Sequence, residues 1–199
     1  MEVATKEQIE AFLKVLDPAD DSTGGGAASA VAGAMAAGLA GMVARVSKGK
    51  PDMEPAGFYD EIDGRARELT NRLLDGAAAD STAFEAVMDG FRMPKDTEAQ
   101  KAVRSDAIQA GLERATEVPL LNGERCTEVL ELVARLAPKH NLNAASDLAV
   151  GRRLARAALE GCLDNVEINL GSLKREAPRE TFTRRLEALR AAASGIEGV

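Results

Sequence analysis

Residues 24–44 form a run without a charged side chain, and Ala and Gly fill most of its positions. The run is long enough to span a bilayer as a helix. Membrane insertion is driven by Leu, Ile, Phe and Val, however, and Ala and Gly contribute little apolar area. We therefore expect no membrane span but a buried helix, at the centre of a bundle or at a subunit seam. Small residues, which let neighbouring backbones approach closely, recur every fourth position on two faces of this helix. One face carries Gly33, Ala37 and Gly41, and the other carries Ala30, Ala34 and Gly38.

The composition narrows the class of protein. The chain has 199 residues, of which 45% are hydrophobic and only 3% aromatic, so it suits a single domain over residues 1–199. The formal net charge of −7 repels phosphate backbones, so nucleic acid is not an expected partner. One His and two Cys leave too few ligands for a zinc site, so we expect no metal. The acidic, polar N-terminus does not resemble a secretory signal, and a cytoplasmic location is expected.

Apolar residues at helical spacing predict an all-α fold, a single-domain antiparallel bundle of long helices. No period-2 run of β-branched residues predicts a strand. Asp96 or Thr97 can cap the helix that contains Pro119, where a kink is expected. The expected helices cover about residues 5–16, 24–44, 62–91, 97–137, 146–173 and 179–193.

Asp80 is the first candidate for chemistry, because it interrupts a long apolar stripe. Burial of a carboxylate raises its pKa toward the range useful for general acid or base catalysis. A structural Asp that is bonded to a helix end or to an Arg explains the pattern equally well. The stripe comprises Ile62, Ala66, Leu69, Leu73, Ala77, Asp80, Phe84, Val87 and Phe91.

Asp147 is the second candidate and lies beside Ser146 at an expected helix start. An Asp at this position is ordinarily a cap or compensates the helix dipole. Further along the same helix, Asn165 and Asn169 are unexpected polar residues four positions apart. They can hold polar groups of a long ligand, or they can cross-link helices as Asn does in ordinary bundles.

The glycine run Gly24, Gly25 and Gly26 precedes the Ala/Gly helix and resembles an anion-binding loop. It matches neither the P-loop nor the dinucleotide fingerprint, since no strand precedes it and no Lys-Ser/Thr pair follows it. The run can equally be a sharp turn into a crowded helix. His140 is read as an exposed loop residue, and Cys126 and Cys162 as small residues of the core.

Several segments, in this order along the chain, resemble the cyclodeaminase/cyclohydrolase family of folate enzymes. They are the glycine run, Gly49-Lys50, Asp80-Ser81-Thr82-Ala83-Phe84, Met93-Pro94-Lys95-Asp96-Thr97, Ala115-Thr116-Glu117-Val118-Pro119-Leu120, Asn141-Leu142-Asn143 with Ser146-Asp147, and Asn165-Val166-Glu167-Ile168-Asn169-Leu170. The family contains the C-terminal domain of formiminotransferase-cyclodeaminase and stand-alone methenyltetrahydrofolate cyclohydrolases. The resemblance implies an all-helical homodimer that binds a tetrahydrofolate derivative in a cleft and uses no metal or organic cofactor.

The resemblance also implies roles for the candidate residues. Asp80 would be the principal acid or base, Asp147 would tune it or hold the pterin, and Lys50 would contribute charge. The remaining candidates would position the pterin and glutamate portions of the substrate: Gly24, Gly25, Gly26, Lys95, Asn141, Asn143, Ser146, Asn165 and Asn169.

The expected reaction takes place at the methenyl carbon of the folate. It is either hydrolysis of 5,10-methenyltetrahydrofolate or formation of that compound from 5-formimidoyltetrahydrofolate with release of ammonia. The alternative is a non-catalytic folate-binding or helical dimerisation module on the same scaffold. The alternative is motivated by the unusual loop at residues 48–55 and by the small-residue helix.

Overall fold

The computed structural model describes residues 24–195, and every regular element within this range is helical. This confirms the all-α prediction. The helix expected over residues 5–16 lies outside the described residues. The described elements are α2 (Gly25–Ser47), α3 (Ala56–Arg92), α4 (Glu98–Leu136), the short 3-10 helix η2 (Leu142–Ala144), α5 (Ala145–Ser172) and α6 (Glu176–Gly195).

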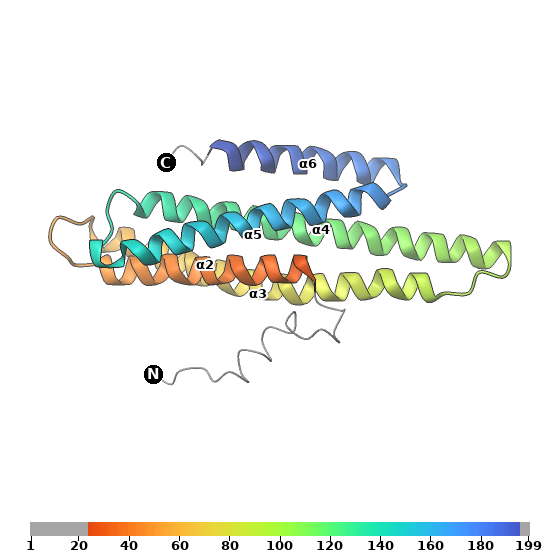
Figure 1. Cartoon of the computed structure of the whole chain (residues 1–199), viewed down its shortest axis with the longest axis horizontal. Helices are drawn as coiled ribbons and strands as arrows, with labels where there is room; N and C mark the ends of the chain where they lie inside the picture. The colour runs from red at the N-terminus through yellow and green to blue at the C-terminus, as the bar shows by residue number, and fades with distance from the viewer. Residues whose placement is uncertain (1–23, 196–199) are drawn as a thin grey trace, which may run out of the picture.

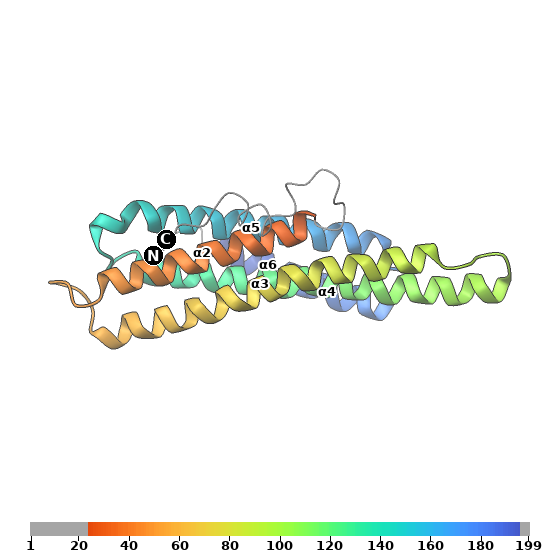
Figure 2. The same cartoon turned by 90° about the horizontal axis from the view of Figure 1, so that it is seen from below.

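Helices α2, α3, α4 and α5 lie lengthwise against one another as a four-helix bundle, and α6 packs outside it on α4 and α5 (Figure 1). Gly41 of α2 packs on Ala66 of α3 and Gly26 packs on Asp80, so these two helices run antiparallel. In both Figure 1 and Figure 2, α2 begins well short of the α3–α4 turn. The N-terminus of α2 therefore opens along the side of the bundle and not at its tip.

Helix α2 is long and apolar enough to cross a membrane by length and composition, and 67% of its most apolar window is buried in the structure. Burial of this kind is typical of the core helix of a bundle. A Cβ added at Gly33 would lie 2.7 Å from the Sγ of Cys126, so this face needs glycine for close packing, as expected. On the other expected face Ala30 and Ala34 are buried, but Gly38 is exposed and has open space around it.

The apolar stripe of α3 lies in a different register from the one traced in the sequence. Phe84 and Phe91 are 44% and 51% exposed, so their assignment to the buried stripe was wrong. Small residues, which permit close approach of α4, take their place. The buried positions after Leu73 are Gly76, Ala83, Val87 and Gly90, with Asp80 in the same heptad register.

Gly76 is one position where close approach requires glycine. A Cβ there would lie 2.0 Å from the Oδ1 of Asn122, whose side chain is fully buried in α4. That oxygen also accepts a hydrogen bond from Arg125 at 2.9 Å. Asn122 therefore cannot withdraw without loss of a buried contact.

We expect Gly76→Ala to lower the free energy of unfolding by about 1–3 kcal/mol, the usual cost of overpacking. The matched control is Gly64→Ala on the same helix, where an added Cβ meets nothing within 4 Å. The control should gain stability by up to about 1 kcal/mol from helix propensity. Urea denaturation of both variants measures the difference, and equal midpoints would contradict the packing described here.

The other helix boundaries follow the sequence signals. Thr97 caps α4 and accepts a hydrogen bond from the backbone of Gln100, whose side chain caps in return. Pro119 lies inside α4, as predicted. The apolar side predicted for α5 is buried throughout: Ala155, Leu159, Cys162, Val166, Leu170 and Leu173.

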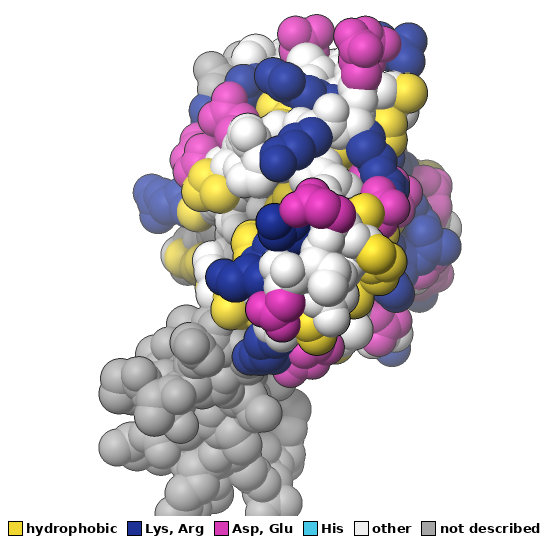
Figure 3. Space-filling model, turned by 90° about the vertical axis from the view of Figure 1, so that its right-hand side faces the viewer, with side chains coloured by type: hydrophobic (Ala, Val, Ile, Leu, Met, Phe, Trp, Pro, Cys, Tyr) yellow, Lys and Arg dark blue, Asp and Glu magenta, His cyan; other side chains and the backbone are white. Residues whose placement is uncertain are grey.

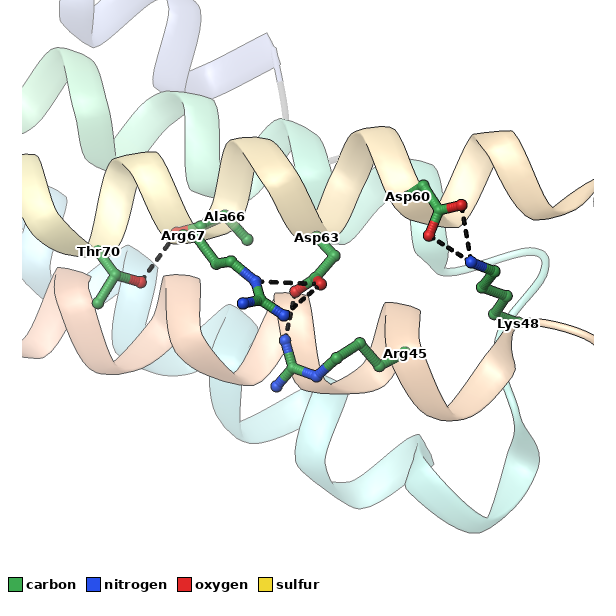
Figure 4. Close-up of polar contacts among 7 residues, drawn as sticks. All are labelled: Arg45, Lys48, Asp60, Asp63, Ala66, Arg67 and Thr70. Carbon is green, nitrogen blue, oxygen red and sulfur yellow. Dashed lines mark hydrogen bonds and ion pairs between the residues drawn. The ribbon is translucent and has the colours of Figure 1, made fainter.

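Polar contacts fix α2 against α3 on the outer side of the bundle (Figure 4). Asp63 of α3 bonds to both Arg45 of α2 and Arg67 of its own helix. Burial opposes ionisation of Asp63, but the two guanidinium groups outweigh it and hold its pKa below the ordinary value. One turn away along the pair, Lys48 reaches the carboxylate of Asp60 at 2.6 Å.

Candidate functional site

The carboxylate of Asp80 lies directly against the first turn of α2. A Cβ added at Gly26 would lie 2.5 Å from each carboxylate oxygen, so only glycine leaves room for the acid. The backbone N–H of Ala27 donates a hydrogen bond to Asp80. Because the glycine run carries no side chains, the first backbone N–H groups of α2 are accessible, and the carboxylate that lies against them is Asp80.

The surroundings of Asp80 favour its protonated form. Burial raises the pKa of its carboxyl above the ordinary value of 3.8, and the Ala27 hydrogen bond offsets only part of this effect. No ion pair within residues 24–195 involves Asp80. A carboxyl with a raised pKa is better suited than an ordinary carboxyl to accept a proton and then donate it.

A buried thiol, that of Cys162, lies near this carboxyl. The Cys162 thiol donates a hydrogen bond to Cys126, and this bond, burial and the charge of Asp80 together hold the pKa of Cys162 well above 9.0, so the thiol stays protonated. Cys162 was not predicted as a neighbour of Asp80. The signal was available for Cys162, which precedes Asn165 by three positions on one face of α5.

Helix α5 completes the site from the other side of α2. The Nδ2 of Asn165 donates to the carbonyl of Gly161 at 2.8 Å and lies 3.5 Å from the Cβ position of Gly25. Gly161 leaves space for Ser29, whose hydroxyl donates to the carbonyl of Gly25 at 2.7 Å. The structure therefore brings together four of the predicted site residues, hereafter the α2 N-terminal site: Gly25, Gly26, Asp80 and Asn165. Gly24 adjoins them, with open space around it.

Asn169 lies one turn further along α5, where it cross-links helices. Its Nδ2 donates to the carbonyl of Ala115 in α4 at 2.7 Å. This is the structural role that the sequence analysis left open beside ligand binding. Its side-chain oxygen and one N–H remain for a ligand.

A second group of predicted residues gathers at the opposite end of α2: Lys50, Asn141, Asn143, Ser146 and Asp147. Asn141 donates its backbone N–H to the hydroxyl of Ser47 at 2.8 Å and its side-chain N–H to the carbonyl of Val46 at 3.2 Å. Its Oδ1 accepts the backbone N–H of Asn143 at 3.1 Å. Asp147 lies in the first turn of α5, where an acid compensates the helix dipole.

The length of α2 separates the two groups within one chain. Its 23 residues span about 34 Å at 1.5 Å per residue. Neither Asp147 nor Lys50 therefore reaches Asp80 in the same chain.

Lys95 belongs to neither group. It is exposed in the turn between α3 and α4. Figure 3 shows that this end of the bundle carries basic and acidic side chains side by side.

The raised pKa of Asp80 also affects stability. A carboxyl whose pKa is higher in the folded state binds more protons folded than unfolded, so stability falls as pH rises above the ordinary value of 3.8 and the penalty is complete above the folded pKa. We expect Asp80→Asn to raise the melting temperature at pH 7, and this gain to shrink as pH falls toward 3.8. Thermal melts across pH measure it, and an unchanged or lowered melting temperature at pH 7 would show that the ionised carboxylate is stabilised.

Comparisons with known proteins support the fold, and their matches cover most of the chain. The family model described as "Formiminotransferase-cyclodeaminase" matches residues 8–188. The chain is 36% identical over 199 residues to a methenyltetrahydrofolate cyclohydrolase of Methylorubrum extorquens, covering 98% of this chain and 94% of that one. It is 28% identical over 188 residues to the formimidoyltransferase-cyclodeaminase of Rattus norvegicus, of which it spans 34%.

A solved structure shows the same fold. The crystal structure of formiminotetrahydrofolate cyclodeaminase from Thermotoga maritima superposes with a TM-score of 0.82 at 28% identity, covering 98% of this chain and 92% of that one. A match of this extent, together with the full-length relative, identifies the scaffold. The chain belongs to the formiminotransferase-cyclodeaminase family.

Proposed function

We propose that this chain is a folate one-carbon enzyme that acts at the methenyl carbon, with Asp80 as the acid and base. The observation that carries the proposal is the carboxyl with a raised pKa at the α2 N-terminal site. The full-length relative named for methenyltetrahydrofolate hydrolysis supports the substrate class. The rat relative, of which the chain spans about a third, and the Thermotoga protein support cyclodeamination as the second reaction of the same site.

In hydrolysis, a water molecule adds to the carbon between N5 and N10 of 5,10-methenyltetrahydrofolate. As the new C–O bond forms, the ionised Asp80 takes a proton from the water and the cationic amidinium becomes neutral. One C–N bond then breaks, and the protonated Asp80 returns a proton to the departing nitrogen. As the C=O bond of the formyl group forms on the other nitrogen, the hydroxyl proton is released to solvent, and Asp80 ends ionised as it began.

In cyclodeamination, N10 of 5-formimidoyltetrahydrofolate attacks the carbon of the protonated formimidoyl group, whose nitrogen becomes an amine on a tetrahedral carbon. Asp80 accepts the N10 proton and delivers it to that amine, which leaves as ammonia and forms the cationic methenyl ring. Both reactions need one group that is first base and then acid. Both reactions are complete with proton transfers alone, so we propose no metal or organic cofactor. We also propose a cytoplasmic location.

The α2 amides and Asn165 are proposed to position the substrate. Unblocked N–H groups at a helix N-terminus attract anionic and carbonyl oxygens. Gly24 leaves an open approach to them, since no atom lies within 4 Å of its Cβ position. Lys95 and Asn169 are proposed to bind the glutamate portion.

We also propose a homodimer in which α2 packs antiparallel on the partner's α2. Gly38 and Met35 are exposed on α2. A cavity of about 630 Å³ at Gly38 is lined by the small residues Ala37, Gly41 and Ala66 and by the ion pairs of Asp63 with Arg45 and Arg67. Antiparallel pairing would place the partner's Lys50 and Asp147 group beside Asp80. This pairing explains how two groups about 34 Å apart in one chain can serve one site.

Mixing two inactive variants tests the shared site. We expect Asp80→Asn and Asp147→Asn each to be inactive, and a refolded equal mixture to recover about a quarter of wild-type activity, because half of the dimers carry one intact site of two. Light scattering at micromolar concentration checks the dimer itself. A mixture as inactive as its components would show that the partner's Asp147 does not complete the Asp80 site.

A non-catalytic folate-binding or dimerisation module is the second candidate, favoured by the small residues exposed on α2. The test is to incubate the protein with 5-formimidoyltetrahydrofolate, and to measure ammonia release and the melting temperature together. Ammonia release above the buffer rate supports an enzyme of the cyclodeaminase type. Stabilisation by folate without turnover of this substrate or of 5,10-methenyltetrahydrofolate would support the non-catalytic module.

A further inference from the structure

A cavity of about 530 Å³ lies between α4 and α5, beside the C-terminal end of α6. It is separate from the α2 N-terminal site, because its α5 residues end at Arg156 whereas Asn165 lies more than two turns further on. Its size falls within the range of small-molecule pockets. We call it the arginine pocket, after Arg152, Arg153 and Arg156 in its wall.

The floor of the arginine pocket is apolar. Leu130 and Val133 of α4 and Leu148 of α5 line it, and small alanines leave the hollow between them, Ala193 of α6 among them. A floor of this kind binds the hydrocarbon or aromatic body of a ligand through burial of apolar area. An apolar floor does not orient a ligand by itself, so polar groups at the rim must orient it.

The rim is cationic. Among the described residues that line the pocket, none is Asp or Glu, although the whole chain carries a net charge of −7. Arg156 pairs with Glu160 at 2.9 Å, whereas no ion pair within residues 24–195 involves Arg152 or Arg153. The positive charge that the rim offers to a ligand therefore comes from Arg152 and Arg153.

The start of α5 and His140 complete the pocket wall. Helix α5 begins at Ala145, and the acid Asp147 in its first turn compensates the helix dipole there. The Nδ1 of His140 lies 2.9 Å from the carbonyl of Ala137, a contact that assigns the proton to Nδ1 and makes Nε2 an acceptor. The arginines are therefore the groups that can bind an anionic head group.

We propose that the arginine pocket binds a small amphiphilic carboxylate, with its head group on Arg152 and Arg153 and its apolar body on the floor. Planar guanidinium groups match a carboxylate by paired hydrogen bonds. A neutral amphiphile would leave the arginines without a counter-ion, and a simple inorganic anion would leave the apolar floor uncovered. The proposal rests on the lining of the pocket and not on the proposed folate chemistry.

Calorimetry with sodium octanoate as the probe tests the proposal on the full chain. We expect one octanoate per chain, and no binding of octanol or octyltrimethylammonium at the same concentration. The double variant Arg152→Gln/Arg153→Gln should weaken octanoate binding at least tenfold while it leaves turnover unchanged. Ala134→Phe, which fills the floor and keeps the charges, should weaken it to a similar extent.

The matched control is Arg179→Gln/Arg184→Gln on α6. These arginines also line a surface hollow, but one that contains Glu176 and Glu180, so the same charge change should leave octanoate binding within twofold. Equal weakening by both double variants, or equal binding of octyltrimethylammonium, would overturn the site. Displacement of octanoate by 5-formyltetrahydrofolate would assign the pocket to the folate and overturn its independence.

Discussion

Replacement of Asp80 by Asn is expected to lower kcat for hydrolysis of 5,10-methenyltetrahydrofolate by about 100-fold to 10,000-fold, the usual contribution of a positioned acid or base. Asn keeps the size of the side chain and can still accept the Ala27 hydrogen bond. It cannot take up a proton, however, so the addition of water loses its base. Stopped-flow decay of the methenyl chromophore measures kcat.

The KM for the folate should change little in this variant, because the residue acts on the proton and not on binding. Circular dichroism and the melting temperature serve as controls for folding. Since burial disfavours the ionised carboxylate, the variant is expected to be at least as stable as the wild type at pH 7. A stable Asp80→Asn protein with wild-type kcat would assign the chemistry to another group.

Gly26→Ala is expected to lower kcat by about 100-fold, the scale of a misplacement of about 1 Å. The added Cβ would lie 2.5 Å from both oxygens of Asp80, so the carboxylate has to turn away from the α2 amides. Because the displaced atoms are the end of a side chain, and Ala favours the helix, stability should change little.

Gly64→Ala on α3 is the matched control, since an added Cβ there meets nothing within 4 Å and Gly64 lies outside the α2 N-terminal site. It should keep kcat within about twofold, because substitutions at uncrowded positions usually have small effects. The same assay, with unfolding measured in parallel, compares the two variants. An equal loss in both would mean that the loss in Gly26→Ala does not come from contact with Asp80.

The helices could be predicted from the sequence because their signals are local. The Ala/Gly run, the capping pair Thr97 and Gln100, and the break at Pro94 each act within a few residues. The register of α3 beyond Leu73 could not be predicted in this way. It depends on Gly76 and Gly90 meeting Asn122 and Ile108 of α4, and sequence periodicity gave more weight to Phe84 and Phe91 than to glycine.

The candidate site could be predicted in part, because two of its features are also local signals. Asp80 stood out as one acid in an apolar stripe, and the glycine run stood out as an open helix start. Their contact depends on the antiparallel packing of α2 on α3, which no local pattern contains. The distance from Asp80 to Asp147 likewise follows from the length of α2 and from where α5 begins.

The most direct test of the account is to add the purified protein to 5,10-methenyltetrahydrofolate and to follow the near-ultraviolet methenyl chromophore against buffer alone. We expect decay that is faster than in buffer, proportional to protein concentration and saturable in substrate, with a base of raised pKa visible in its pH dependence. Decay at the buffer rate here, together with no growth of the same chromophore from 5-formimidoyltetrahydrofolate, would contradict an enzyme that acts at the methenyl carbon.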